Sequence, residues 1–173
     1  MPGPGRAAVL AATAILAACA PSSVPLPPQR RTFTGPERHP FAAFVNLADP
    51  HAEAYIVRGV RPEGRWAWTA QRAELRFRLE EPRAWRFAAD LFIAGQTLRE
   101  TGPVTVSFFI NGKLLGKLRA DEAREFSFDQ PVPPGWLDPA APVAVAMEAD
   151  PVWRGPDGKE FGFLLVSAGF RPQ

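Results

Sequence analysis

The sequence predicts an all-β domain, an antiparallel β-sandwich of jelly-roll type, and three observations support this prediction. Apolar stretches of strand length recur from residue 54 onward, separated by Pro, Gly and Asp. No window shows a sustained apolar stripe of helical period. The connections include both a tight turn and a proline-rich crossover, so that about seven to nine strands would fill two packed layers.

The first strands are predicted from a period of two. In residues 75–80 and 85–93, apolar side chains alternate with mostly polar ones, which indicates one buried and one solvated face. Cross-strand ion pairs on the solvated face are expected for Glu74, Arg76, Arg78 and Arg86, and the alternative is that these residues contact an anionic polymer. The residues predicted to face the core are Leu75, Phe77, Leu79, Trp85, Phe87, Ala89, Leu91 and Ile93.

Residues 104–118 are predicted to form a hairpin. Val104, Val106, Phe108 and Ile110 alternate inward, and the next two residues, Asn111 and Gly112, tolerate the positive φ angles of a type I′ turn. Further strands are expected at 125–129, 143–150 and 161–170. The prolines and glycine of 131–135 should carry the chain across the domain rather than around a tight turn.

Little regular secondary structure is expected outside these strands. Residues 121–124 are the one place outside the N-terminal segment where a helical turn is predicted. The apolar residues of 33–48 are expected to cover a sheet edge or one end of the sandwich, and they are Phe41, Phe44, Val45 and Leu47.

The N-terminal residues are predicted to form an export signal. Arg6 precedes a short apolar run, residues 7–18, which as a helix would reach about 18 Å and cannot span a bilayer core of about 30 Å. The ending Leu16-Ala17-Ala18-Cys19 resembles the lipobox of bacterial lipoproteins. The alternative is an ordinary signal peptide with an incidental cysteine.

The resemblance implies that Cys19 receives a diacylglycerol and becomes the mature N-terminus. It implies three parts: a signal peptide (1–18), the lipidated cysteine with a proline-rich tether (19–31), and a β-sandwich domain (32–173). The protein is then expected in the cell envelope. Because Ala20 is not aspartate, the resemblance favours the outer membrane in a cell that has two.

Composition excludes several classes of partner. The chain has 20 Lys and Arg against 18 Asp and Glu, with no basic block, so nucleic acid is not an expected partner. One cysteine and two histidines cannot supply a cysteine-rich zinc site, and residues 157–160 have too few oxygen ligands for calcium. No metal or cofactor is therefore expected.

Residues 54–171 resemble a carbohydrate-binding-like β-sandwich module found in bacterial envelope proteins and beside glycosyltransferase domains. The matching motifs are residues 59–63 ahead of Trp66-Ala67-Trp68-Thr69, the strand 73–77, the hairpin strand 106–112, and 157–162 before the last strand. Lys159 departs from the pattern, which has arginine after the Asp-Gly pair. Lysine lacks the planar fork needed for a bidentate contact with a carboxylate.

The candidate ligand-binding residues are two loop tryptophans with nearby charged groups: Trp153, Arg154, Asp157, Trp136 and Glu63. Each tryptophan has the alternative role of plugging an end of the core. The other tryptophans, Trp66, Trp68 and Trp85, are predicted to be core residues.

Enzymatic activity is not expected, because no serine has the glycine context of a nucleophile elbow. Glu63 with Asp157 is the one carboxylate pair that could be named for glycoside hydrolysis. Two functions remain: a non-enzymatic, lipid-anchored protein that binds glycan or another envelope polymer, and a structural or assembly lipoprotein that docks to another envelope protein without binding sugar. An open groove with aromatic and polar groups would favour the first.

Replacing Cys19 with Ser is expected to leave an exported protein that appears in the soluble fraction, because stable anchoring needs two acyl chains or more. Cell fractionation and the intact mass of the mature wild-type protein provide the measurement. A wild-type species that starts at Cys19 without added lipid mass would disprove the anchor.

Overall fold

The computed structural model of this chain describes residues 43–79, 81 and 83–173. The predicted signal peptide, the tether, Cys19 and Phe41 lie outside the described residues. Within the described part, no helix is long and apolar enough to cross a membrane.

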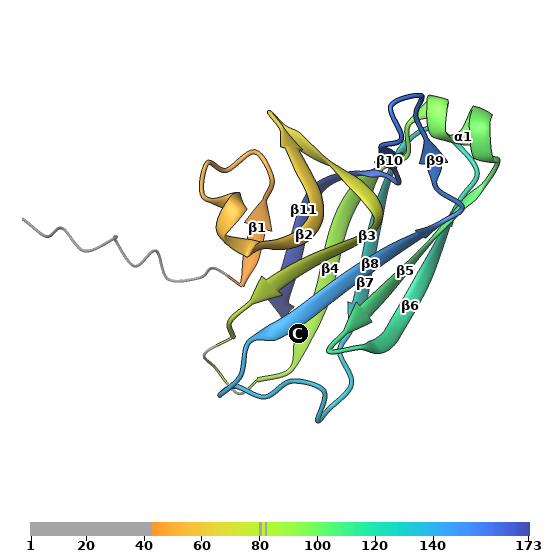
Figure 1. The fold of residues 1–173 in the computed structure, drawn as a ribbon. Coiled ribbons are helices and arrows are strands. Elements are labelled where there is room, and N and C mark those ends of the chain that lie inside the picture. The colour runs from red at the N-terminus through yellow and green to blue at the C-terminus, as the bar shows by residue number, and fades with distance from the viewer. Residues whose placement is uncertain (1–42, 80, 82) are drawn as a thin grey trace, which may run out of the picture. The chain divides into compact units, whose positions relative to one another are not determined.

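The predicted all-β class of jelly-roll type is confirmed, because antiparallel strands make up most of the described chain (Figure 1). The strands are β1 (Phe44–Asn46), β2 (Ile56–Glu63), β3 (Trp66–Phe77), β4 (Trp85–Phe92), β5 (Val104–Ile110), β6 (Lys113–Ala120), β7 (Glu125–Pro131), β8 (Val143–Asp150), β9 (Trp153–Arg154), β10 (Glu160–Phe161) and β11 (Leu164–Pro172). A 3₁₀ turn, η1 (Ala52–Tyr55), precedes β2, and a short helix, α1 (Gly95–Thr101), joins β4 to β5.

The two layers of the sandwich belong to one hydrogen-bonded sheet that turns at β3. The strand order is β6-β5-β8-β3-β11-β4-β7, with β2 paired to β3 and β1 paired to β11. Residues 67–68 of β3 pair with β11, whereas residues 72–77 pair with β8. Figure 1 shows β3 bending in its middle, as strands that pass from one layer to the other do.

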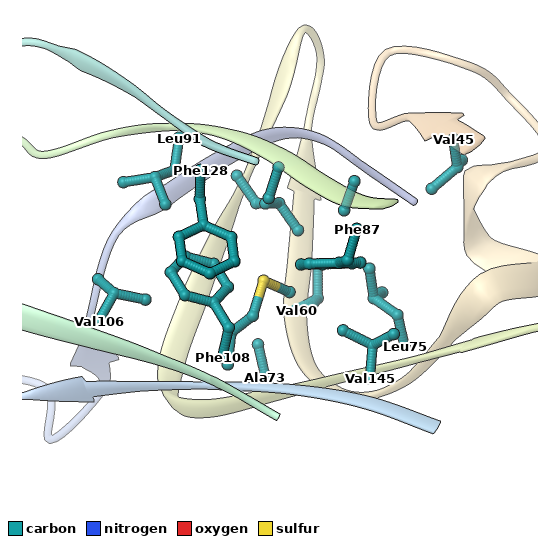
Figure 2. Close-up of a cluster of buried hydrophobic side chains, with 14 of the residues drawn as sticks. Val45, Val60, Ala73, Leu75, Phe87, Leu91, Val106, Phe108, Phe128 and Val145 are labelled. Atoms are coloured by element: carbon teal, nitrogen blue, oxygen red, sulfur yellow. The ribbon is translucent and has the colours of Figure 1, made fainter. Parts of the chain in front are cut away.

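Aromatic packing closes the far side of the sandwich, where the two end strands β6 and β7 do not pair. The Phe108 ring of β5 stacks on the Phe128 ring of β7, with centroids 3.8 Å apart and planes at 13° (Figure 2). A Cβ on Gly116 of β6 would lie 3.0 Å from the Phe128 ring. This close approach explains a glycine inside a strand.

The predicted alternation is confirmed in the three strands where it was clearest. All eight residues of 75–93 expected in the core are buried, as are Val104, Val106, Phe108 and Ile110. Asn111 and Gly112 have φ angles of 48° and 79°, which confirms the hairpin turn. The crossover after β7 is also confirmed, since β8 pairs with β3 and β5 rather than with β7.

The prediction for residues 33–48 holds where the structure describes them. β1 adds to one edge of β11, and both Val45 and Leu47 are buried.

The strand predicted at 161–170 is divided, because β10 ends at Phe161 and β11 begins at Leu164.

The helix prediction was wrong. Residues 121–124 contain no helix, because Arg124 extends the β4–β7 ladder by accepting a hydrogen bond from the Ile93 amide at 3.2 Å. The helix is α1, which begins after Ala94 without a side-chain cap and ends at Gly102, whose φ is 76°. Seven residues without a polar N-cap carry no sequence signal for a helix.

Two of the three tryptophans predicted to be core residues were also misplaced. Trp85 is buried, but Trp66 is 45% exposed and Trp68 is half-buried on the outer face of β3. Ala67 and Thr69 point inward instead. The period of two, counted back from the buried Leu75, would have shown this, because the odd-numbered residues of β3 are buried except for Gln71 at the bend.

Replacing Phe108 with Ala is expected to lower the free energy of unfolding by about 3–5 kcal/mol, because its fully buried ring leaves a cavity between the layers. Arg78→Ala, on an exposed side chain, should cost less than about 0.5 kcal/mol. Urea unfolding of both variants in the Cys19→Ser background measures the difference. Small and equal effects would contradict the register.

Candidate functional site

Three aromatic side chains form a cluster at one end of the sandwich. The Phe161 ring of β10 lies 4.8 Å from the Trp153 ring of β9 and 5.1 Å from the Trp68 ring of β3, measured between centroids. All three side chains are half-buried. We call Trp68, Trp153 and Phe161 the aromatic cluster.

The aromatic cluster is held by local backbone structure and by one arginine. β9 pairs with β10, so that Trp153 lies opposite Phe161. Arg61 of β2 places its guanidinium 5.2 Å from the centroid of the Phe161 ring and donates a hydrogen bond of 2.9 Å to the Glu160 carbonyl. A cation above a ring and an anchored backbone both restrict the position of Phe161.

An open groove of about 680 Å³ lies near the aromatic cluster, over the bend of β3. Small residues leave room for it, since Gly59, Ala70 and Ala149 are among those that line it. β2 bulges at Gly59, whose φ is 69° and whose added Cβ would lie 2.0 Å from the Arg72 carbonyl oxygen. The remaining lining residues are polar or charged: Arg58, Gln71, Arg72, Glu148, Asp150 and Glu160.

A network of ion pairs crosses the groove. Oε1 of Glu74 accepts hydrogen bonds of 2.6 Å from Arg58 and from Arg72, and Arg72 also pairs with Glu148. The hydrogen bonds from Arg58 and then from Arg72 lower the pKa of Glu74 from an ordinary 4.5 to about 2. The Glu74 carboxylate therefore stays ionised throughout the neutral range.

Glu160 connects the groove to the aromatic cluster. Its Oε2 accepts a hydrogen bond of 3.1 Å from the Gln71 amide, and its Oε1 accepts one of 2.9 Å from Arg154. These contacts, the Gln71 amide first, lower the pKa of Glu160. Because Glu160 lines the groove and directly precedes Phe161, its carboxylate is fixed between the polar and the aromatic parts of the site.

The structure separates the five predicted site residues. Trp153 and Arg154 lie at the aromatic cluster. Asp157 lies in the β9–β10 turn and pairs with Lys159 at 2.7 Å, a hydrogen bond that lowers the pKa of Asp157. Glu63 is exposed at the β2–β3 hairpin, where it lies opposite Trp66.

Trp136 belongs to the other end of the domain. It lies on the β7–β8 crossover, packs partly against the core, and its carbonyl accepts a hydrogen bond of 2.9 Å from the Asn111 side chain. Lys113 lies 5.4 Å from the centroid of its ring. Figure 1 shows this crossover and the β9–β10 pair at opposite ends of β8, so Trp136 is not part of the groove.

Most residues of the groove were not predicted from the sequence. The prediction placed Glu74, Arg76, Arg78 and Arg86 on a solvated face with cross-strand ion pairs. The structure contains Arg58–Glu74 and Arg86–Asp129, whereas Arg76 and Arg78 form no ion pair with another described residue. The prediction did not single out Arg58, Arg72, Glu148 or Glu160. A period of two along β3 would have placed Trp68, Ala70, Arg72 and Glu74 on the same outer face.

A second cavity of about 700 Å³ lies at the crossover end. Its lining includes Trp85, Leu79, Leu137 and four prolines of the crossover. Among the described residues, no group of three or more His, Cys, Asp or Glu side chains is arranged to hold a metal ion.

Comparisons with known proteins identify no family. No family model and no curated protein matches the chain. Among solved structures, a family GH115 4-O-methyl-α-glucuronidase with specificity for decorated arabinogalactans matches 77% of this chain and 18% of its own length, at 8% identity and a TM-score of 0.46. An acetyl xylan esterase from the rumen bacterium Butyrivibrio proteoclasticus matches 75% of this chain and 33% of its own length, at 11% identity and a TM-score of 0.41.

The carbohydrate-binding module Xyl-CBM35, solved with a glucuronic-acid-containing disaccharide, matches 75% of this chain and 93% of its own length, at 14% identity and a TM-score of 0.41. This chain thus spans about a fifth of the glucuronidase and a third of the esterase. At such identities and TM-scores, what these proteins bind or cleave remains a property of those proteins.

The stability of the domain is expected to fall in acid partly through Glu74. Its pKa is about 2 in the folded state and 4.5 ordinarily, so its stabilising contribution is present above pH 4.5 and is lost as the pH falls toward 2. Glu74→Gln should therefore lose less stability than wild type between pH 5 and about 2.5. Urea unfolding at several pH values measures this, and equal losses would contradict the role of the ion-pair network.

Proposed function

We propose that this protein is a non-catalytic glycan-binding domain, with its site formed by the groove and the aromatic cluster. The position of Glu160 is the observation that carries the proposal. Its carboxylate is fixed between the groove and the aromatic cluster by two hydrogen bonds that arise from β3 and β9. Fixed polar groups beside aromatic rings in an open depression are the usual elements of a small-ligand site.

The chemistry of sugars matches these elements. A sugar ring has apolar C–H faces that stack on aromatic side chains, and the half-buried rings of Trp68 and Trp153 offer such surfaces. Its hydroxyl groups both donate and accept hydrogen bonds. The guanidinium and carboxylate groups of the groove supply the complementary acceptors and donors.

The same proposal places the protein in the cell envelope, anchored by lipid on Cys19 and held off the membrane by the tether. It supports a polysaccharide as the partner rather than nucleic acid. In a cell with two membranes, the lack of an aspartate after Cys19 favours an outer-membrane location. Docking to another envelope protein without binding sugar remains the alternative.

Replacing Trp153 with Ala is expected to weaken glycan binding by at least about tenfold, because a central aromatic contact contributes more than about 1.4 kcal/mol. Its packing on Phe161 accounts for only about 1 kcal/mol of stability. Glycan-array screening followed by calorimetry on the Cys19→Ser protein measures binding, and urea unfolding measures stability.

Arg86→Ala provides the matched control, since Arg86 lies on β4 and pairs with Asp129 away from the groove. It should bind like wild type. A Trp153→Ala protein that is strongly destabilised, or a wild-type protein that binds no glycan, would overturn the proposal and favour the docking alternative.

A further inference from the structure

We infer that the groove selects neutral sugars and discriminates against acidic ones such as uronic acids. This inference rests on the proposed function and adds the chemical class of the ligand. Four arginines and four carboxylates surround the groove and the aromatic cluster, so their formal charges cancel: Arg58, Arg61, Arg72, Arg154, Glu74, Glu148, Asp150 and Glu160.

Every arginine at the site already has a partner. Arg58 and Arg72 share Glu74, Arg72 also pairs with Glu148, and Arg154 pairs with Glu160. Arg61 is engaged by the Glu160 carbonyl and the Phe161 ring. An anionic sugar that pairs with Arg58, Arg72 or Arg154 would therefore compete with a protein carboxylate that already neutralises that arginine.

The carboxylates that line the groove also repel an anionic sugar. Asp150 lines the groove and makes no ion pair within 4 Å with any described residue. Glu160 and Glu148 line the same groove. A uronate would come close to all three carboxylates, and juxtaposed like charges are a strong source of discrimination.

The hydroxyl groups of a neutral sugar meet no such repulsion. The ion pairs also leave hydrogen-bond donors and acceptors free to bind these hydroxyls. Glu74 receives both of its hydrogen bonds on Oε1, so its Oε2 remains available to a ligand donor. Arg72 donates from Nε and Nη1, and a guanidinium carries five N–H groups in all. A hydroxyl that bridges Arg72 and Glu74 would add hydrogen bonds without breaking the ion pair.

Two cations lie near the site but outside it. Arg119 and Lys117 of β6 stand in register with Thr105 and Ser107 of β5, which in turn lie opposite Asp150 and Glu148. Two strand spacings separate them from β8, roughly 9–10 Å. They would attract an acidic polymer only loosely, in a manner that salt screens.

Binding of matched neutral and acidic ligands tests the inference. Calorimetry on the Cys19→Ser protein would compare xylohexaose, cellohexaose and mannohexaose with hexagalacturonate and with glucuronic-acid-decorated xylo-oligosaccharides, at low and at high NaCl. We expect one neutral oligosaccharide to bind at least about tenfold more tightly than every acidic one. Its affinity should change less than about twofold with salt, since its contacts involve no net charge.

Asp150→Asn tests the source of the discrimination. Removing this carboxylate should reduce the difference in affinity between neutral and acidic ligands several-fold. Glu122→Gln, which removes an exposed carboxylate elsewhere, should leave that difference unchanged. Preference for an acidic oligosaccharide that depends on Trp153 would overturn the inference and leave the proposed function intact. Absence of binding to any glycan would overturn both.

Discussion

The bend of β3 is the constraint on which both the fold and the site depend. Its first half pairs with β11 and its second half with β8, so one strand belongs to both layers. Thr69, buried before the bend, secures it: its hydroxyl donates to the Phe163 carbonyl and accepts from the Phe163 amide, each at 3.0 Å. Because a buried hydroxyl must be hydrogen-bonded, this pair joins β3 to the start of β11 at a defined point.

The groove is a consequence of that bend. Where β3 leaves one layer for the other, Ala70, Gln71 and Arg72 face outward, and the bulge of β2 at Gly59 follows the same turn. Gly162 lies so close to β3 that an added Cβ would be 2.8 Å from the Ala70 carbonyl oxygen. The short β9–β10 pair is thereby carried against β3, which brings Phe161 to Trp68 and Glu160 to Gln71.

Charge pairing then determines the character of the site. Exposed ion pairs contribute little to stability individually, but here they share partners across β2, β3 and β8 and hold each other in one arrangement. The result is a surface rich in hydrogen-bonding groups and poor in net charge. Such a surface suits a ligand of many hydroxyls better than an ion.

By itself the sequence determined the fold class, the buried faces of residues 75–93 and 104–110, and the turn at Asn111-Gly112, because period-two alternation and turn chemistry are local properties. It also indicated Trp153 and Arg154, since an aromatic in a proline- and glycine-rich loop is visible in the chain. Only the tertiary structure decided the separation of Trp136 from Trp153 and the meeting of Arg58, Glu74, Glu148 and Glu160. Those contacts join residues far apart in sequence, and they depend on strand order, a bulge and a bend, none of which is encoded in any short segment.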